Sequence, residues 1–84
     1  MEIELSAKAA RQWKRLLRNE QLLNRIEQAL DNITANPHSG KELEAELAGI
    51  RSYRVGDWRI LYKVIHKRLV VLILSIAHRR DVYR

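Results

Sequence analysis

The sequence predicts an α+β domain in which two antiparallel helices cover one face of a four-stranded sheet. Apolar residues recur at helical spacing through residues 7–33, and three apolar segments with short turns between them follow residue 49. A short alternating segment precedes the helices. The chain has 84 residues, which suffice for one thin core and leave nothing for a second. We therefore expect residues 1–84 to form a single domain.

The N-terminal segment predicts a strand followed by a helix. Residues 2–5 alternate acidic and apolar side chains, which is typical of a half-exposed strand. Ser6 follows at the position of a helix N-cap, because its hydroxyl can accept a hydrogen bond from a free amide of the first turn. The apolar residues behind it recur at helical spacing and are Ala9, Ala10, Trp13, Leu16 and Leu17.

A second apolar stripe is the strongest helical signal in the chain. Its members are Leu22, Leu23, Ile26, Ala29, Leu30 and Ile33. Asn36-Pro37 ends it, since a residue before proline disfavours helical geometry. Only a corner at Asn19-Glu20 separates the two helices, so they form an antiparallel hairpin. Residues 41–48 alternate acidic and apolar side chains, and we expect an irregular connector or a short helix there.

The C-terminal half predicts an antiparallel meander. Its three expected strands are residues 50–55, 58–65 and 69–77. Gaps of two and three residues between them require hairpins. In the middle strand, Trp58, Ile60, Tyr62 and Val64 share one face, while Arg59, Leu61, Lys63 and Ile65 share the other. Residues 69–74 are apolar throughout, as expected of a strand that is covered on both faces.

The charge distribution points to a polyanionic partner. The formal net charge is +6. Residues 1–48 carry seven basic and eight acidic side chains, whereas residues 49–84 carry nine basic and two acidic ones, a net charge of +7. A surface this polarised indicates a binding face rather than a device for solubility, although charge alone leaves both interpretations open.

Several functional classes are excluded by composition. The chain has no cysteine, which excludes a disulfide scaffold, a thiol nucleophile and a thiolate zinc site. The three histidines are scattered, so we expect neither a metal site nor a cofactor. We find no signal peptide and no apolar run near the roughly 20 residues that span a bilayer. A cytoplasmic protein without a membrane partner is the simplest expectation.

Two arginines of the predicted hairpin are expected to lie side by side. Arg54 and Arg59 flank the turn at Gly56-Asp57, and hairpin geometry places them opposite each other. Because an unpaired arginine is costly to bury, Arg59 either reaches the rim and pairs with Asp57 or meets an anion. Two like charges at this range favour a phosphate or carboxylate shared between them.

Further polar side chains follow the end of the last expected strand, residues 69–77. His78, Arg79, Arg80 and Tyr83 lie here, and each alone could belong to a frayed basic tail. Together they suit RNA cleavage without a metal, which requires deprotonation of a 2′-hydroxyl, stabilisation of a dianionic phosphate and protonation of the leaving oxygen. Arginines serve the second need, and histidine or tyrosine can move protons.

Two segments together resemble the RelE family of bacterial and archaeal toxins. They are LAGIRSYRVGDWRILY at residues 47–62 and AHRRDVY at residues 77–83. The likeness covers essentially the whole chain and is specific to the RelE/ParE superfamily. It implies a ribosome-dependent mRNA endonuclease that cuts codons in the ribosomal A site, and a cognate antitoxin wrapped around the toxin.

The resemblance also implies roles for individual residues. Arg59 matches the arginine that contacts the scissile phosphate, and Arg79 matches a catalytic arginine. Tyr83 matches a tyrosine that stacks on the nucleotide, and His78 is a candidate for an acid/base role. Arg54 matches a basic position that holds the RNA backbone. The further expected RNA-binding residues are Arg51 and Arg80.

One position departs from the family pattern. Ser52 stands where many relatives carry lysine or arginine, so the general base has no assignment. Arg51 is a poor substitute, because successive strand residues face opposite ways. Two alternatives therefore stay open: a ParE-type DNA gyrase inhibitor and a non-catalytic basic module. For the toxin that the resemblance implies, we expect the partner antitoxin to use an acidic or amphipathic contact segment, and oligomers to form mainly through that complex.

Overall fold

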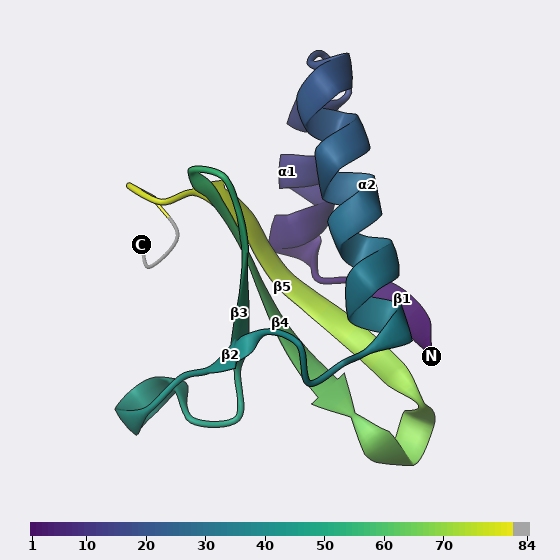
Figure 1. Cartoon of the computed structure of the whole chain (residues 1–84), viewed down its shortest axis with the longest axis vertical. Coiled ribbons are helices and arrows are strands. Elements are labelled where there is room, and N and C mark those ends of the chain that lie inside the picture. Colours follow the sequence, from purple (N-terminus) through teal and green to yellow (C-terminus); the bar gives the residue numbers. More distant parts are fainter. Residues whose placement is uncertain (82–84) are drawn as a thin grey trace.

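Two helices pack against one face of a five-stranded sheet in the computed structural model, which describes residues 1–81 (Figure 1). The strands are β1 (Glu2–Leu5), β2 (Lys41–Glu42), β3 (Arg51–Val55), β4 (Trp58–Ile65) and β5 (Val70–His78). Their order in the sheet is β1-β5-β4-β3-β2. β1 runs parallel to β5, and all other neighbours are antiparallel. The predicted α+β class and the meander are confirmed.

The helical hairpin begins and ends where its sequence signals lie. α1 (Ala7–Leu16) begins after Ser6, whose Oγ accepts a hydrogen bond from the amide of Ala9 at 3.0 Å. α2 (Glu20–Ala35) begins after Asn19, whose side chain caps it in the same way, and ends ahead of Pro37. Neither helix of the described residues 1–81 is long and apolar enough to cross a membrane.

The main core lies between the helices and the sheet. α2 contributes Ile26 and Ile33, which are fully buried, and the sheet contributes Ile60, Tyr62 and Ile73. The predicted alternation of β4 is therefore confirmed, with Ile60 and Tyr62 on the helix side. A second, smaller cluster lies on the opposite face and consists of Leu61, Ala77, Leu43, Ile50 and Leu74. We call this opposite face, which no helix covers, the open face (Figure 1).

The connector before the meander differs from the expectation. Lys41–Glu42 forms β2 and pairs with β3 at the sheet edge, so the sheet has five strands rather than four. A 3₁₀ turn, η1 (Ala45–Leu47), follows it. Two residues are too few to produce a recognisable strand pattern in the sequence. The short strand is instead held by tertiary contacts around Gly40.

The apolar strand β5 lies centrally in the sheet, between β1 and β4. It begins at Val70 rather than Leu69, because Leu69 adopts a left-handed conformation with φ +54° and is 65% exposed. A β-bulge opposite Leu61 and Tyr62 shifts its register against β4. The bulge changes which side chains face the open side along the last part of the strand.

Candidate functional site

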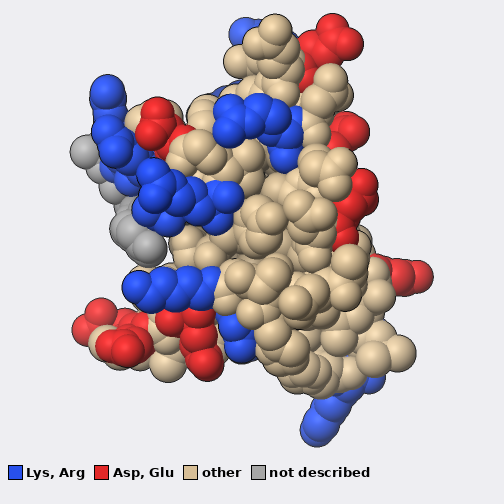
Figure 2. Space-filling view, in the orientation of Figure 1, with Lys and Arg blue, Asp and Glu red and all other residues tan. Residues whose placement is uncertain are grey.

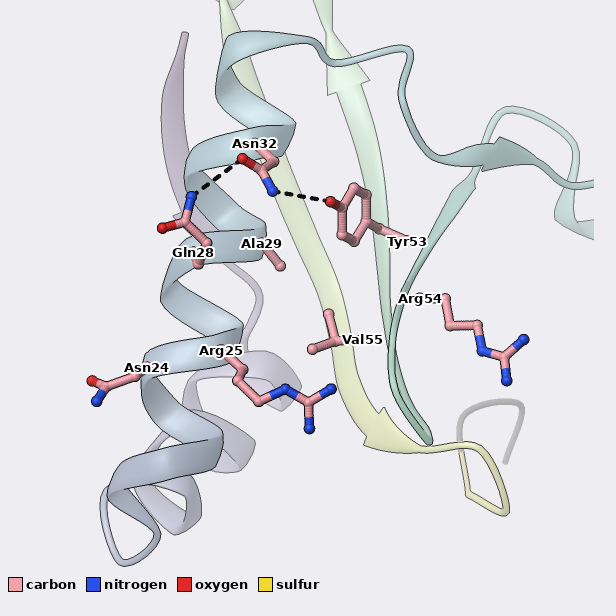
Figure 3. Close-up of a pocket in the computed structure, with 8 residues that line it drawn as sticks. All are labelled: Asn24, Arg25, Gln28, Ala29, Asn32, Tyr53, Arg54 and Val55. Atoms are coloured by element: carbon pink, nitrogen blue, oxygen red, sulfur yellow. Dashed lines mark hydrogen bonds between the residues drawn. The ribbon is translucent and has the colours of Figure 1, made fainter.

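Arginines from two strands meet on the open face, as predicted. Arg54 lies directly across from Arg59, and Arg59 lies across from Ala77 on β5. The two neighbours of Arg54 in β3, Tyr53 and Val55, pack on the helix-side core, so Arg54 points away from the helices. Figure 3 shows this, with Val55 directed toward α2 and Arg54 directed away from it.

The end of β5 brings two more arginines to the same hairpin. The amide of Arg79 donates to the carbonyl of Asp57 at 2.7 Å, and the amide of Asp81 donates to the carbonyl of His78 at 2.8 Å. Arg79 and Arg80 are therefore held in a turn beside the β3–β4 hairpin, and both are exposed. Figure 2 shows basic side chains gathered on this side of the molecule, above acidic side chains near β2 and η1.

Within residues 1–81, no ion pair joins Arg54 or Arg59 to a carboxylate. Arg59 forms no ion pair with Asp57 within residues 1–81, so the pairing considered from the sequence is absent there. Nε of Arg54 donates to the carbonyl of Gly56 at 3.1 Å, which orients the guanidinium along the turn. Adjacent guanidinium groups without counter-charges form a site suited to a phosphate.

His78 is not brought together with these arginines. It pairs with Trp58, which belongs to the helix side, and the two rings meet edge to face with centroids 6.0 Å apart. Its Nδ1 accepts a hydrogen bond from the amide of Arg80 at 3.3 Å. The ring borders a hollow of about 370 Å³ between the helical hairpin and the sheet, which Asn19 and Trp58 also line. An acid/base role for His78 on the open face therefore lacks geometric support.

Arg51 also lies apart from the other arginines. It is opposite Tyr62, on the helix side of the sheet. One of its guanidinium nitrogens donates to the carbonyls of His38 and Gly40, at 3.2 and 2.8 Å. This side chain holds the segment before β2 in place.

Two serines lie in the centre of the open face, on either side of Leu61. Ser52 is opposite Leu61 from β3, and Ser75 is opposite it from β5. They are 8% and 3% exposed, and neither hydroxyl has a hydrogen-bond partner within the described chain. The position that departs from the family pattern is therefore a small, buried side chain, and the basic residue opposite it is Lys41 of β2.

One predicted site residue is not placed. Tyr83 lies outside the described residues, so its position relative to the arginines stays a prediction. Within residues 1–81 no group of three or more His, Cys, Asp or Glu side chains is arranged to hold a metal ion.

A separate groove of about 380 Å³ lies between α2 and β3 (Figure 3). Asn32 donates from Nδ2 to the hydroxyl of Tyr53 at 3.1 Å and closes one end of it. Arg25 lies toward the other end, where a Cβ on Gly56 would come within 2.7 Å of its guanidinium. The groove borders β3 on the helix side and is distinct from the open face.

Comparisons with known proteins agree on one family. A family model described as the ParE toxin of the type II toxin–antitoxin system parDE matches residues 3–83. Toxin RelG of Mycobacterium tuberculosis (strain ATCC 25618 / H37Rv) is 40% identical over 60 residues, which are 70% of this chain and 69% of RelG.

Solved structures of similar shape cover nearly the whole chain. The toxin–antitoxin complex RelBE2 from Mycobacterium tuberculosis contains a chain that is 31% identical, with a TM-score of 0.80 over 93% of this chain and 96% of that one. The YoeB dimer from Staphylococcus aureus is 25% identical, with a TM-score of 0.76 over 93% and 95% of the two chains.

Proposed function

This chain belongs to the ParE toxin family within the RelE/ParE superfamily of type II toxins, and from that premise we propose that it is a ribosome-dependent mRNA endonuclease. The observation that carries the proposal is the arginine pair on the open face, Arg54 opposite Arg59, with Arg79 beside the same hairpin and no carboxylate paired with Arg59 within the described residues. Such a surface matches an RNA backbone.

The proposed reaction is an attack of a ribose 2′-hydroxyl on the neighbouring phosphate in the ribosomal A site. A bond forms between the 2′-oxygen and phosphorus, the bond from phosphorus to the 5′-oxygen breaks, and the products are a 2′,3′-cyclic phosphate and a 5′-hydroxyl. We assign Arg59 to the scissile phosphate and Arg79 to the charge that develops in the transition state. Arg54 and Arg80 hold the backbone, and Tyr83 stacks on the nucleotide.

We further propose a cognate antitoxin as the physiological partner. The solved RelBE2 and YoeB–YefM structures are toxin–antitoxin complexes that contain similar chains. Arg54 and Arg59, which form no ion pair with a carboxylate of residues 1–81, suit an acidic contact segment. In this proposal the toxin acts in the cytoplasm and assembles into oligomers mainly through the antitoxin.

The test is expression of the chain without an antitoxin, followed by primer extension on a translated mRNA. We expect cuts within codons that appear only when ribosomes are present. The matched control is the double variant Arg59→Ala/Arg79→Ala, which should leave the mRNA intact. Intact mRNA with the unsubstituted chain would contradict the proposal.

A second candidate is inhibition of DNA gyrase, which the match to the ParE family model favours. The same cultures distinguish the two candidates. Loss of DNA supercoiling activity with intact mRNA would support gyrase inhibition. Cut mRNA with normal supercoiling would support the endonuclease.

A further inference from the structure

The fifth strand adds a lysine to the open face beside the arginines. Lys41 of β2 lies directly across from Ser52 of β3. Residues directly opposite each other in antiparallel strands point to the same face, and Ser52 shares its face with Arg54, two residues further along β3. Lys41, Arg54 and Arg59 therefore project from three neighbouring strands to one side of the sheet.

The spacing of these strands allows the three charges to converge. Lys41 is the diagonal neighbour of Arg54, a relation in which Cα atoms lie roughly 7–8 Å apart. Its Cα lies roughly 12 Å from that of Arg59, given a strand spacing of about 4.8 Å and a rise of about 3.3 Å per residue. The long stems of lysine and arginine can together bridge this distance, so both charged groups can contact one phosphate.

Ser52 is small and lies below the surface of the open face. Its hydroxyl is buried and has no partner in the described chain, and apolar side chains of the smaller cluster pack beside it. Ser52 therefore contributes no long side chain at the position opposite Lys41. The stem of Lys41, which is exposed, can extend over the surface of the open face toward Arg54 and Arg59.

The start of β2 is held firmly enough to position a functional side chain. The hydroxyl of Tyr62 accepts from the amide of Gly40 at 2.9 Å and donates to the carbonyl of Pro37 at 2.7 Å. Arg51 adds its two hydrogen bonds to the carbonyls of His38 and Gly40. Lys41 itself is exposed, and it forms no ion pair with any residue from 1 to 81.

We propose that Lys41 is a catalytic residue that contacts the scissile phosphate together with Arg59 and stabilises the added negative charge of the transition state. This inference rests on the proposed endonuclease function. It places a positive charge on the edge strand, directly across from Ser52. From there an ammonium group can reach a phosphate that Arg59 also contacts.

The test compares Lys41→Met, which removes the charge and keeps the stem, with Lys41→Arg, which keeps a charge. Lys67→Met is the matched control, because Lys67 lies in η2 (His66–Arg68), at the other end of β4 from Arg59. The substrate is a ribosome programmed with a synthetic mRNA in the A site. Binding is measured on the same complex with a 2′-deoxy nucleotide at the cleavage position, and folding by the urea midpoint.

We expect Lys41→Met to lower the single-turnover cleavage rate roughly ten- to a hundredfold, a smaller effect than loss of a buried oxyanion donor because Lys41 is exposed. Binding to the deoxy complex should weaken much less, and Lys41→Arg should recover most of the rate. If Lys41→Met cleaves the mRNA at the same rate as Lys67→Met, this inference is overturned, whereas the proposed endonuclease function is not. Equal losses in binding and cleavage would also overturn it. Absence of cleavage by the unsubstituted chain would overturn the proposed function and this inference with it.

Discussion

At the scale of single residues, Tyr62 connects the core to the segment that precedes β2. Its ring is fully buried among the residues that face the helices, while its hydroxyl reaches the backbone of Pro37 and Gly40. The hydroxyl thus satisfies the buried amide of Gly40 and the part-buried carbonyl of Pro37. Tyr62 thereby fixes the chain just before Lys41.

We expect Tyr62→Phe to lower the free energy of unfolding by about 1–3 kcal/mol, because it leaves the amide of Gly40 and the carbonyl of Pro37 without their partner. Urea unfolding measures this loss. Tyr53→Phe is the matched control: the hydroxyl of Tyr53 accepts from Asn32 at an exposed site, where water can replace it. Equal losses in the two variants would contradict the role given to Tyr62.

Arg79 and Arg59 should differ in what they contribute to RNA cleavage. If Arg79 stabilises charge that develops in the transition state, Arg79→Ala should lose about 2.7–4 kcal/mol of catalysis, as removal of one oxyanion donor does. Ribosome binding should weaken far less, because other basic residues remain. Arg59→Ala should damage both. Single-turnover cleavage and ribosome binding separate these effects, and equal losses for Arg79→Ala would make it a phosphate anchor.

The sequence predicts the relative positions of those site residues that a short turn joins. The two-residue turn at Gly56-Asp57 forces Arg54 opposite Arg59, and the structure has them so. The face of His78 was not predictable, since residues 70–74 of β5 are all apolar and show no alternation, and a bulge then shifts the register. Lys41, to which we propose a role, was not among the expected site residues because its strand has only two residues. It stands at the start of the segment 41–48, directly after Ser39-Gly40.

At the scale of secondary structure elements, side chains of α1 and its N-cap bond to the part of β5 that does not pair with β1. β1 pairs only with the first part of β5, up to Ile73. Beyond it, Oγ of Ser6 donates to the carbonyl of Leu74 at 3.0 Å, and Oε1 of Gln12 accepts from the amide of Ile76 at 2.7 Å. Two helix side chains thus replace the missing strand partners of a largely buried strand.

We expect Gln12→Ala to lower the free energy of unfolding by about 1–3 kcal/mol, because the amide of Ile76 loses its partner in a part-buried position. Gln28→Ala on α2 is the matched control. It makes the same change in helix propensity and removes only an exposed hydrogen bond to Asn32. Unfolding in urea compares them, and an unchanged stability of Gln12→Ala would mean that water replaces the glutamine.

Most elements were predictable because their signals are local. Ser6 and Asn19 cap the two helices, Pro37 follows the second one, and short turns join the strands of the meander. The edge strand β2 depends on contacts of the preceding Gly40 with Tyr62 and Arg51, which are distant in sequence. Pairing that is decided by tertiary contacts leaves no periodicity to read.

At the scale of the whole molecule, the fold converts a charge difference along the chain into a difference between faces. The acidic and basic side chains of residues 1–48 lie largely on the helical hairpin and its connections, while the excess of basic residues lies in the meander and at its end. Basic side chains therefore gather where the β3–β4 turn meets the end of β5, above the acidic side chains near β2 and η1 (Figure 2). A flexible acidic segment can cover such a face when it orders on binding.

If the antitoxin binds the arginines of the open face, its association rate should fall steeply as the salt concentration rises. Its dissociation rate should change little. Long-range steering is screened by salt, whereas apolar anchors buried in the complex are not. Stopped-flow or surface-based kinetics from low to high salt measure both rates. Arg54→Gln should slow association at low salt more than Lys67→Gln, which removes the same charge from the far end of β4. The prediction would be contradicted by an association rate that does not change with salt concentration, or by equal association rates for the two variants. Either result would mean that the antitoxin binds another surface of the molecule.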